Sequence, residues 1–160
     1  GRAQIVTLIV DADDASISAI AREVAPDWLQ LHGNEMPERI SAIRTLATAR
    51  IIKAVKVATS ADVASAQNYA GAADLVLFDA KSPPGAVLPG GNGLAFDWTI
   101  MEHAPHPFML AGGLTPANVA EAIRVTGADM VDVSSGVESA PGVKDMGLIR
   151  KFIEAAKAAS

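Results

Sequence analysis

The amino-acid sequence predicts an α/β fold built around a parallel β-sheet. Six short apolar runs, rich in β-branched residues, alternate with longer stretches of helical character along the 160 residues. Half of the residues are hydrophobic and only 4% are aromatic. This composition is typical of buried parallel strands and unlike an aromatic-rich β-sandwich. Strands that alternate with helices imply right-handed crossovers, and therefore a parallel sheet.

Turn-forming residues bound the predicted strands. The first apolar run ends at the polar segment 11–14, the second ends at Gly33, and the fifth ends at Gly112 and Gly113. The predicted strands are residues 5–10, 28–32, 51–57, 75–79, 108–111 and 130–133.

Capping residues mark the predicted helices. Asp14 or Ser16 can cap the first helix. Thr115 followed by Pro116 is typical of a helix start, because the missing proline N–H is not needed in the first turn. A proline- and glycine-rich loop at residues 81–93 precedes a short helix, and long loops of this kind in compact domains are commonly functional. The predicted helices are residues 14–25, 37–50, 60–70 and 97–103, one that opens at 115–116, and 145–158.

The position of the glycines favours a barrel over a doubly wound sheet. A doubly wound sheet usually carries its glycine fingerprint after the first strand. Here aspartates follow the first predicted strand, and the glycines follow the last two. We therefore expect a member of the (β/α)8 TIM-barrel family, which closes with eight strands. Because only six βα units are predicted, we expect this chain to be an N-terminally truncated single domain that holds strands 3–8 of the barrel, its C-terminal three-quarters.

Charge and composition argue against several classes of partner. The net charge is −5 and there is no basic stripe, so neither nucleic acid nor anionic lipid is an expected partner. No apolar run approaches the ~18 residues of a membrane span, and no signal-peptide pattern opens the chain. The chain has no cysteine, which excludes disulfides and thiolate metal sites. We expect a cytoplasmic enzyme without a metal ion.

Two loops predict a phosphate site. Gly112 and Gly113 follow the fifth predicted strand, and Ser134, Ser135 and Gly136 follow the sixth. Backbone N–H groups at such strand ends can bind an anion, and glycines without Cβ atoms let it approach closely. Paired loops after consecutive late strands resemble the phosphate site of (β/α)8 barrels. A sugar phosphate is therefore the expected kind of substrate.

Several motifs resemble those of the phosphoribosylanthranilate isomerase family of tryptophan biosynthesis. The resemblance covers nearly the whole chain in order, and Gln-Leu-His-Gly, Leu-Phe-Asp and Val-Asp-Val-Ser-Ser-Gly-Val-Glu are its most specific parts. The matching segments are residues 29–35, 52–55, 77–81, 88–93, 96–98, 108–119 and 130–138.

The resemblance implies an Amadori rearrangement of a phosphorylated sugar–anthranilate substrate, without any cofactor. An acid protonates the ring oxygen during ring opening, and a base removes the C2 proton. Asp79 matches the family's general acid, which must hold its proton, and an apolar setting would favour that. The family's general base is a cysteine near the end of the first barrel strand, which this chain lacks. An arginine for the anthranilate carboxylate also belongs to the expected missing part, so the chain alone should be inactive.

Other polar residues receive roles by the same resemblance. His32 matches the histidine that lines the substrate pocket, and Asp132 matches a substrate contact. Lys53 is either a charged pocket residue or an interior partner of a carboxylate, and the sequence leaves both open. His103 and His106 are expected in loops. Trp98 is expected to anchor the long loop by packing.

Other functions fit the same residues. Another phosphate-binding barrel, such as an indole-glycerol-phosphate or thiamine-phosphate synthase, would share the glycine loops. A non-catalytic fragment that binds phosphate or oligomerises through open sheet edges is the third possibility. The full-length protein is expected to be a monomer or a homodimer.

Overall fold

The computed structural model describes residues 3–80 and 97–159, and these residues form two compact units. One unit comprises residues 3–55 and 65–77, and the other comprises residues 56–64, 78–80 and 97–159. Strands β3 and β4 run from one unit into the other. The proline- and glycine-rich loop predicted at residues 81–93 lies outside the described residues.

The first unit contains parallel strands with helices on one face. Strands β1, β2, β3 and the start of β4 are hydrogen-bonded neighbours in that order. Leu31 of β2 is in register with Ile9 and with Lys53. The elements are β1 (Val6–Ile9), α1 (Asp14–Glu23), β2 (Trp28–Leu31), α2 (Pro37–Leu46), β3 (Arg50–Val57), η1 (Ala66–Tyr69) and β4 (Leu75–Ala80), and α3 (Ser60–Ser65) precedes η1.

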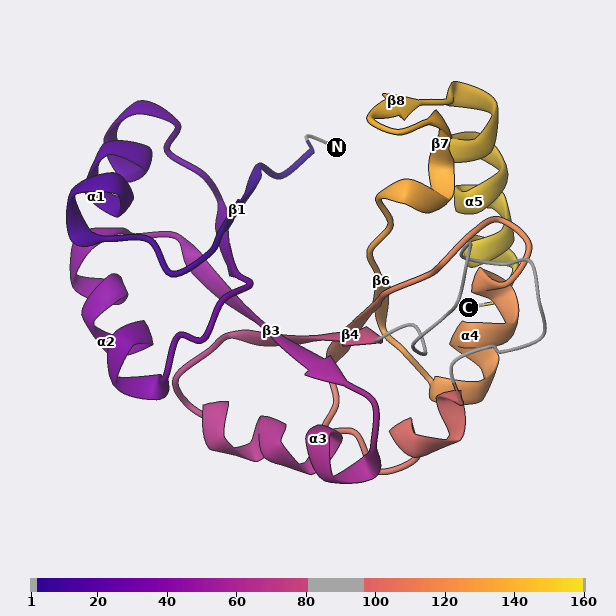
Figure 1. The fold of residues 1–160 in the computed structure, drawn as a ribbon, viewed down its shortest axis with the longest axis horizontal. Coiled ribbons are helices and arrows are strands. Elements are labelled where there is room, and N and C mark those ends of the chain that lie inside the picture. The colour runs from indigo at the N-terminus through magenta and orange to yellow at the C-terminus, as the bar shows by residue number, and fades with distance from the viewer. Residues whose placement is uncertain (1–2, 81–96, 160) are drawn as a thin grey trace. The chain divides into compact units, whose positions relative to one another are not determined.

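The core of the first unit lies between the sheet and helices α1 and α2, which lie side by side in Figure 1. Apolar side chains from every second strand position meet Ile17 of α1 and Ile40 and Ile43 of α2. Each of these three isoleucines is at most 1% exposed. Burial of a side chain of this size stabilises the fold by roughly 1.5–3 kcal/mol.

The second unit continues the same pattern. The end of β4, β5 and β6 are hydrogen-bonded neighbours, and α4 and α5 lie side by side (Figure 1). Phe78 of β4 and Phe108 of β5 are fully buried and form an edge-to-face pair with centroids 5.4 Å apart. The elements are η2 (Trp98–Met101), β5 (Phe108–Ala111), α4 (Val119–Thr126), β6 (Met130–Val131), η3 (Ser135–Val137), β7 (Glu138–Ala140), β8 (Val143–Lys144) and α5 (Met146–Ala159).

The prediction of an α/β fold with a parallel sheet is confirmed, with local corrections. The cap of α1 is Asp13, whose side chain accepts a hydrogen bond from the Ser16 N–H at 2.8 Å. The helix predicted to open at Thr115 begins instead at Val119. The antiparallel hairpin of β7 and β8 was not predicted. Among the helices of the described residues, none has the length and apolar character needed to cross a membrane.

Candidate functional site

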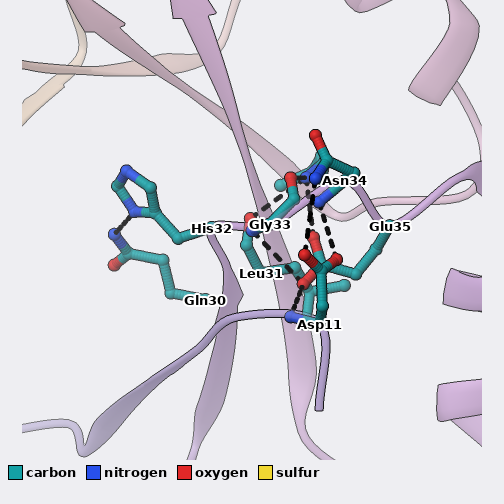
Figure 2. A network of polar contacts seen from close by, with 8 residues as sticks. Asp11, Gln30, Leu31, His32, Gly33, Asn34 and Glu35 are labelled. Carbon is teal, nitrogen blue, oxygen red and sulfur yellow. Dashed lines mark hydrogen bonds and ion pairs between the residues drawn. The ribbon is translucent and has the colours of Figure 1, made fainter.

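His32 directly follows β2, beside a network of polar contacts (Figure 2). Lys53 of β3 lies on the helix-covered face of the sheet, and its Nζ is 2.8 Å from Oε2 of Glu35. The same Nζ donates to the carbonyl oxygens of Gly33, at 2.7 Å, and of Leu31, at 3.4 Å. Both peptide carbonyls that flank His32 in sequence therefore accept a hydrogen bond from one buried ammonium group.

Glu35 and Asp11 join the loop after β1 to the loop after β2. Oε1 of Glu35 accepts hydrogen bonds from the N–H of Asp11 at 2.9 Å and of Gly33 at 3.3 Å. Oδ1 of Asp11 accepts one from the N–H of Asn34 at 2.8 Å. A Cβ atom at Gly33 would lie 2.4 Å from Oδ1 and 2.8 Å from the backbone N of Asp11. The close approach of the two loops therefore requires glycine at position 33.

Opposing influences set the ionisation of Glu35. Burial raises the pKa of its carboxyl group, whereas the hydrogen bonds from Lys53 and from the Asp11 N–H lower it. The net effect holds the pKa of Glu35 below its ordinary value, so this carboxyl group is ionised at neutral pH. Lys53 is thus the interior partner of a carboxylate, one of the two roles that the sequence left open.

Asp79 lies in the second unit at the penultimate position of β4, between the buried residues Phe78 and Ala80. Its side chain is half-buried and faces the start of the loop after β5. A Cβ atom at Gly112 would lie 2.9 Å from Oδ1 of Asp79 and 2.3 Å from the carbonyl oxygen of Ala80. The predicted acid and the first glycine of the predicted phosphate loop are therefore adjacent.

The two predicted phosphate loops also touch each other. A Cβ atom at Gly136 would lie 1.8 Å from the carbonyl oxygen of Leu114, so only glycine fits this contact. Gly112 and Gly113 have φ values of +89° and +64°, which glycine adopts without strain. Among the described residues, no atom lies within 4 Å of the position that a Cβ of Gly113 would occupy, so these residues leave the space beside it open.

Side chains that the sequence did not single out hold these loops. Asn118 accepts a hydrogen bond from the Thr115 N–H at 2.7 Å and donates one to the Gly113 carbonyl at 3.1 Å. This use of residues 115–118 as a turn explains why α4 begins later than predicted. Lys144 of β8 donates to the carbonyl oxygen of Ser134 at 2.9 Å and to its Oγ at 3.2 Å.

The structure places Asp79, Gly112, Gly113, Asp132, Ser134, Ser135 and Gly136 in the second unit and His32 in the first. Asp132 directly follows β6, and its N–H donates to the Leu110 carbonyl at 2.9 Å. The roles assigned to these eight residues stay predictions. The role of Glu35 was not predicted. An acidic residue shortly after a strand, and a lysine among the apolar residues of β3, were the signals that could have revealed the ion pair of Glu35 and Lys53.

The remaining predicted residues lie outside this arrangement. His103 and His106 are exposed, and Nδ1 of His106 is 2.9 Å from Oδ2 of Asp129. Trp98 is the first residue of η2. Its predicted packing against the loop at residues 81–93 lies outside the described residues. Within residues 3–80 and 97–159, no three His, Cys, Asp or Glu side chains are grouped so as to hold a metal ion.

Comparisons with known proteins show the family of this chain. A sequence model described as "N-(5'phosphoribosyl)anthranilate (PRA) isomerase" matches residues 1–155. A protein of Rhodopseudomonas palustris (strain BisA53), named N-(5'-phosphoribosyl)anthranilate isomerase, is 54% identical over 160 residues, which are 99% of this chain and 73% of the relative.

Solved structures of similar proteins carry the same name. The phosphoribosyl anthranilate isomerase from Thermotoga maritima is 37% identical, with a TM-score of 0.81 over 96% of this chain and 72% of that one. A second structure, 34% identical with a TM-score of 0.77, covers 96% of this chain and 71% of its own. That enzyme was solved in complex with reduced 1-(o-carboxyphenylamino)-1-deoxyribulose 5-phosphate.

Proposed function

Since the chain belongs to the N-(5'-phosphoribosyl)anthranilate isomerase family, we propose that it carries the acid and phosphate half of that enzyme's site in tryptophan biosynthesis. The reaction converts N-(5-phosphoribosyl)anthranilate to 1-(2-carboxyphenylamino)-1-deoxyribulose 5-phosphate by Amadori rearrangement. The family match over residues 1–155 is the observation that carries this proposal. A (β/α)8 barrel, of which this chain supplies successive parallel βα units, is the fold proposed for the enzyme.

Asp79 is the proposed general acid. It protonates the ring oxygen of the sugar, the bond from that oxygen to C1 breaks, and the nitrogen lone pair forms the C1–N double bond of an iminium ion. A base then removes the C2 proton, and the resulting enolamine rearranges to the aminoketose. The half-buried position of Asp79 near the end of β4, beside the first glycine of the predicted phosphate loop, supports this role.

The phosphate group is proposed to bind against the loops of Gly112 and Gly113 and of Ser134, Ser135 and Gly136. The space that the described residues leave open beside Gly113, and the contact between Leu114 and Gly136, support this site. Backbone N–H groups and serine hydroxyls are suitable donors to phosphate oxygens. His32 and Asp132, each directly after a strand, are the proposed contacts to the rest of the substrate.

The base is not among these residues. The family resemblance assigns it to a cysteine, and the 160 residues contain none. The 160-residue chain by itself is therefore proposed to bind the substrate's phosphate end without completing the rearrangement.

Turnover of N-(5-phosphoribosyl)anthranilate tests the proposed activity and the proposed inability of the 160-residue chain to complete the reaction. The assay compares the protein encoded by the complete gene with the 160-residue chain, and calorimetry with the reduced product analogue measures binding by each. We expect turnover only by the protein encoded by the complete gene. Absence of turnover and of analogue binding by the encoded protein would refute the function, whereas turnover by the chain alone would show that its base is not a cysteine.

A further inference from the structure

The hairpin of β7 and β8, which joins η3 to α5 in Figure 1, is hydrogen-bonded to the second predicted phosphate loop. Nζ of Lys144, in β8, donates to the carbonyl oxygen of Ser134 at 2.9 Å and to its Oγ at 3.2 Å. The same Nζ lies 2.7 Å from Oε1 of Glu138, in β7. The hairpin and both predicted phosphate loops belong to the second unit.

These contacts use the whole hydrogen-bonding capacity of Lys144. An ammonium group has three hydrogens and no acceptor. The carbonyl oxygen and Oγ of Ser134 and the carboxylate of Glu138 supply three acceptors. The hydrogen bond from Lys144 holds the pKa of Glu138 below its ordinary value, so this carboxylate is ionised at neutral pH and balances the charge of the ammonium. Lys144 is therefore suited to hold Ser134, and not to bind a phosphate group itself.

The hairpin fixes the position of Lys144. Glu138 and Lys144 are in register across the two strands, and Oε2 of Glu138 also accepts from the Gly142 N–H at 3.1 Å. The N–H of Asp145, the residue after Lys144, donates to the carbonyl oxygen of Val137 at 2.9 Å. Backbone and side-chain bonds together therefore set where the ammonium lies.

A held carbonyl group also directs the next N–H group. A trans peptide unit is planar, and its C=O and N–H bonds point in opposite directions. Because the carbonyl of Ser134 is directed at Lys144, the N–H of Ser135 is directed away from that ammonium. The hydroxyl of Ser134 accepts from Lys144, so its own hydrogen is available to another acceptor. Ser134 and Ser135 are both exposed, so a phosphate group can approach these two donors.

We propose that Lys144, aligned by Glu138, is a positioning residue for phosphate binding. It holds Ser134 so that the Ser134 hydroxyl and the Ser135 N–H donate to oxygens of the substrate's phosphate group. This inference rests on the proposed function for its ligand and on the hairpin contacts for the support. Lys144 acts only through Ser134.

Calorimetry with inorganic phosphate, on the protein encoded by the complete gene, tests this role. Lys144→Met keeps the alkyl chain and loses the ammonium, and we expect about tenfold weaker binding, as loss of one hydrogen bond implies. Lys144→Arg keeps donors for Ser134 and Glu138, and should bind phosphate within about threefold of the unmodified protein. Lys151→Met, at an exposed position of α5, is the control for the loss of one positive charge. Equal binding by Lys144→Met and Lys151→Met would overturn the inference.

Glu138→Ala distinguishes support of the loop from simple attraction of charge. This variant loses a negative charge, so a Lys144 that attracted phosphate directly would bind it more tightly. We expect weaker binding instead, because the ammonium loses the carboxylate that aligns it. Glu154→Ala, exposed on α5, is the control for the same change of charge. Tighter binding by Glu138→Ala than by Glu154→Ala would overturn the inference.

Kinetics and backbone motion separate this role from a general loss of stability. In Lys144→Met we expect KM for the phosphorylated substrate to rise about tenfold while kcat stays within about threefold. Relaxation of the ¹⁵N-labelled backbone, measured without phosphate, should show greater motion of the Ser135 N–H in Lys144→Met than in Lys151→Met. Unchanged motion of Ser135 in Lys144→Met would overturn the inference. A rigid Ser135 in an unmodified protein that binds no phosphate would instead refute the proposed phosphate site.

Discussion

Nζ of Lys53 lies 2.8 Å from Oε2 of Glu35, and each of these side chains is only 2% exposed. Burial of an ion pair is costly unless further hydrogen bonds satisfy both partners. Here the ammonium also donates to two peptide carbonyls, and the carboxylate accepts from two peptide N–H groups. The pair therefore ties the loop after β2 to β3 and to the loop after β1.

Removal of one partner of this pair should destabilise the protein strongly. In Lys53→Met the carboxylate of Glu35 stays buried without its cation, and we expect a loss of about 3–5 kcal/mol in the free energy of unfolding. The double variant Lys53→Met, Glu35→Gln should recover most of that loss, because a neutral amide can still accept from the Asp11 and Gly33 N–H groups. Urea denaturation measures both values. Equal stability of the single and double variants would contradict an energetic coupling of the pair.

A fall in pH should lower the free energy of unfolding, partly through protonation of Glu35. Its pKa in the folded state lies below the ordinary value of 4.5, so the unfolded chain takes up more protons as the pH falls. The stabilisation is complete above pH 4.5 and is lost as the pH falls from there through the folded-state pKa. Urea denaturation over this pH range should give a shallower pH dependence in the double variant. An unchanged dependence would place the acid sensitivity on other carboxyl groups.

The variant Asp79→Asn should lower kcat and leave substrate binding largely intact. Asparagine keeps the shape of the side chain but cannot deliver a proton, and general acid catalysis contributes about 10²–10⁴-fold. Steady-state kinetics of the protein encoded by the complete gene measure kcat, and calorimetry with the reduced product analogue measures binding. Retention of kcat within about threefold of the unmodified enzyme would assign proton donation to another residue.

In the protein encoded by the complete gene, the variant Gly113→Val should raise KM for the phosphorylated substrate. The new side chain would enter the open space beside residue 113 and block a phosphate group, whose hydrogen bonds are worth about 1.5–3 kcal/mol each. We expect KM to rise roughly ten- to a hundredfold.

Gly71→Val is the matched control for this substitution. Gly71 has a φ of +79° and, like Gly113, no atom of residues 3–80 or 97–159 within 4 Å of its Cβ position. Both substitutions therefore strain the backbone similarly, but only Gly113→Val enters the proposed phosphate site. An equal change of KM in the two variants would show that strain, and not loss of phosphate contacts, is responsible.

Local sequence determined most of the secondary structure. The strand Phe108–Ala111 has the predicted bounds, because an apolar run between a proline and two glycines has few other conformations. The hairpin of β7 and β8 was missed for an equally local reason. Its strands have two and three residues, of which all but Glu138 are exposed, so they carry no hydrophobic periodicity.

Tertiary structure alone decided which polar groups meet. Lys53 and Glu35 are 18 residues apart, and the sequence left a pocket and an interior role for Lys53 equally open. Only the register that places Lys53 beside Leu31, together with the turn at Gly33, brings the carboxylate to the ammonium. Strand periodicity specifies the face on which a side chain lies, but a hydrogen bond depends on the spacing between chain segments that packing brings together.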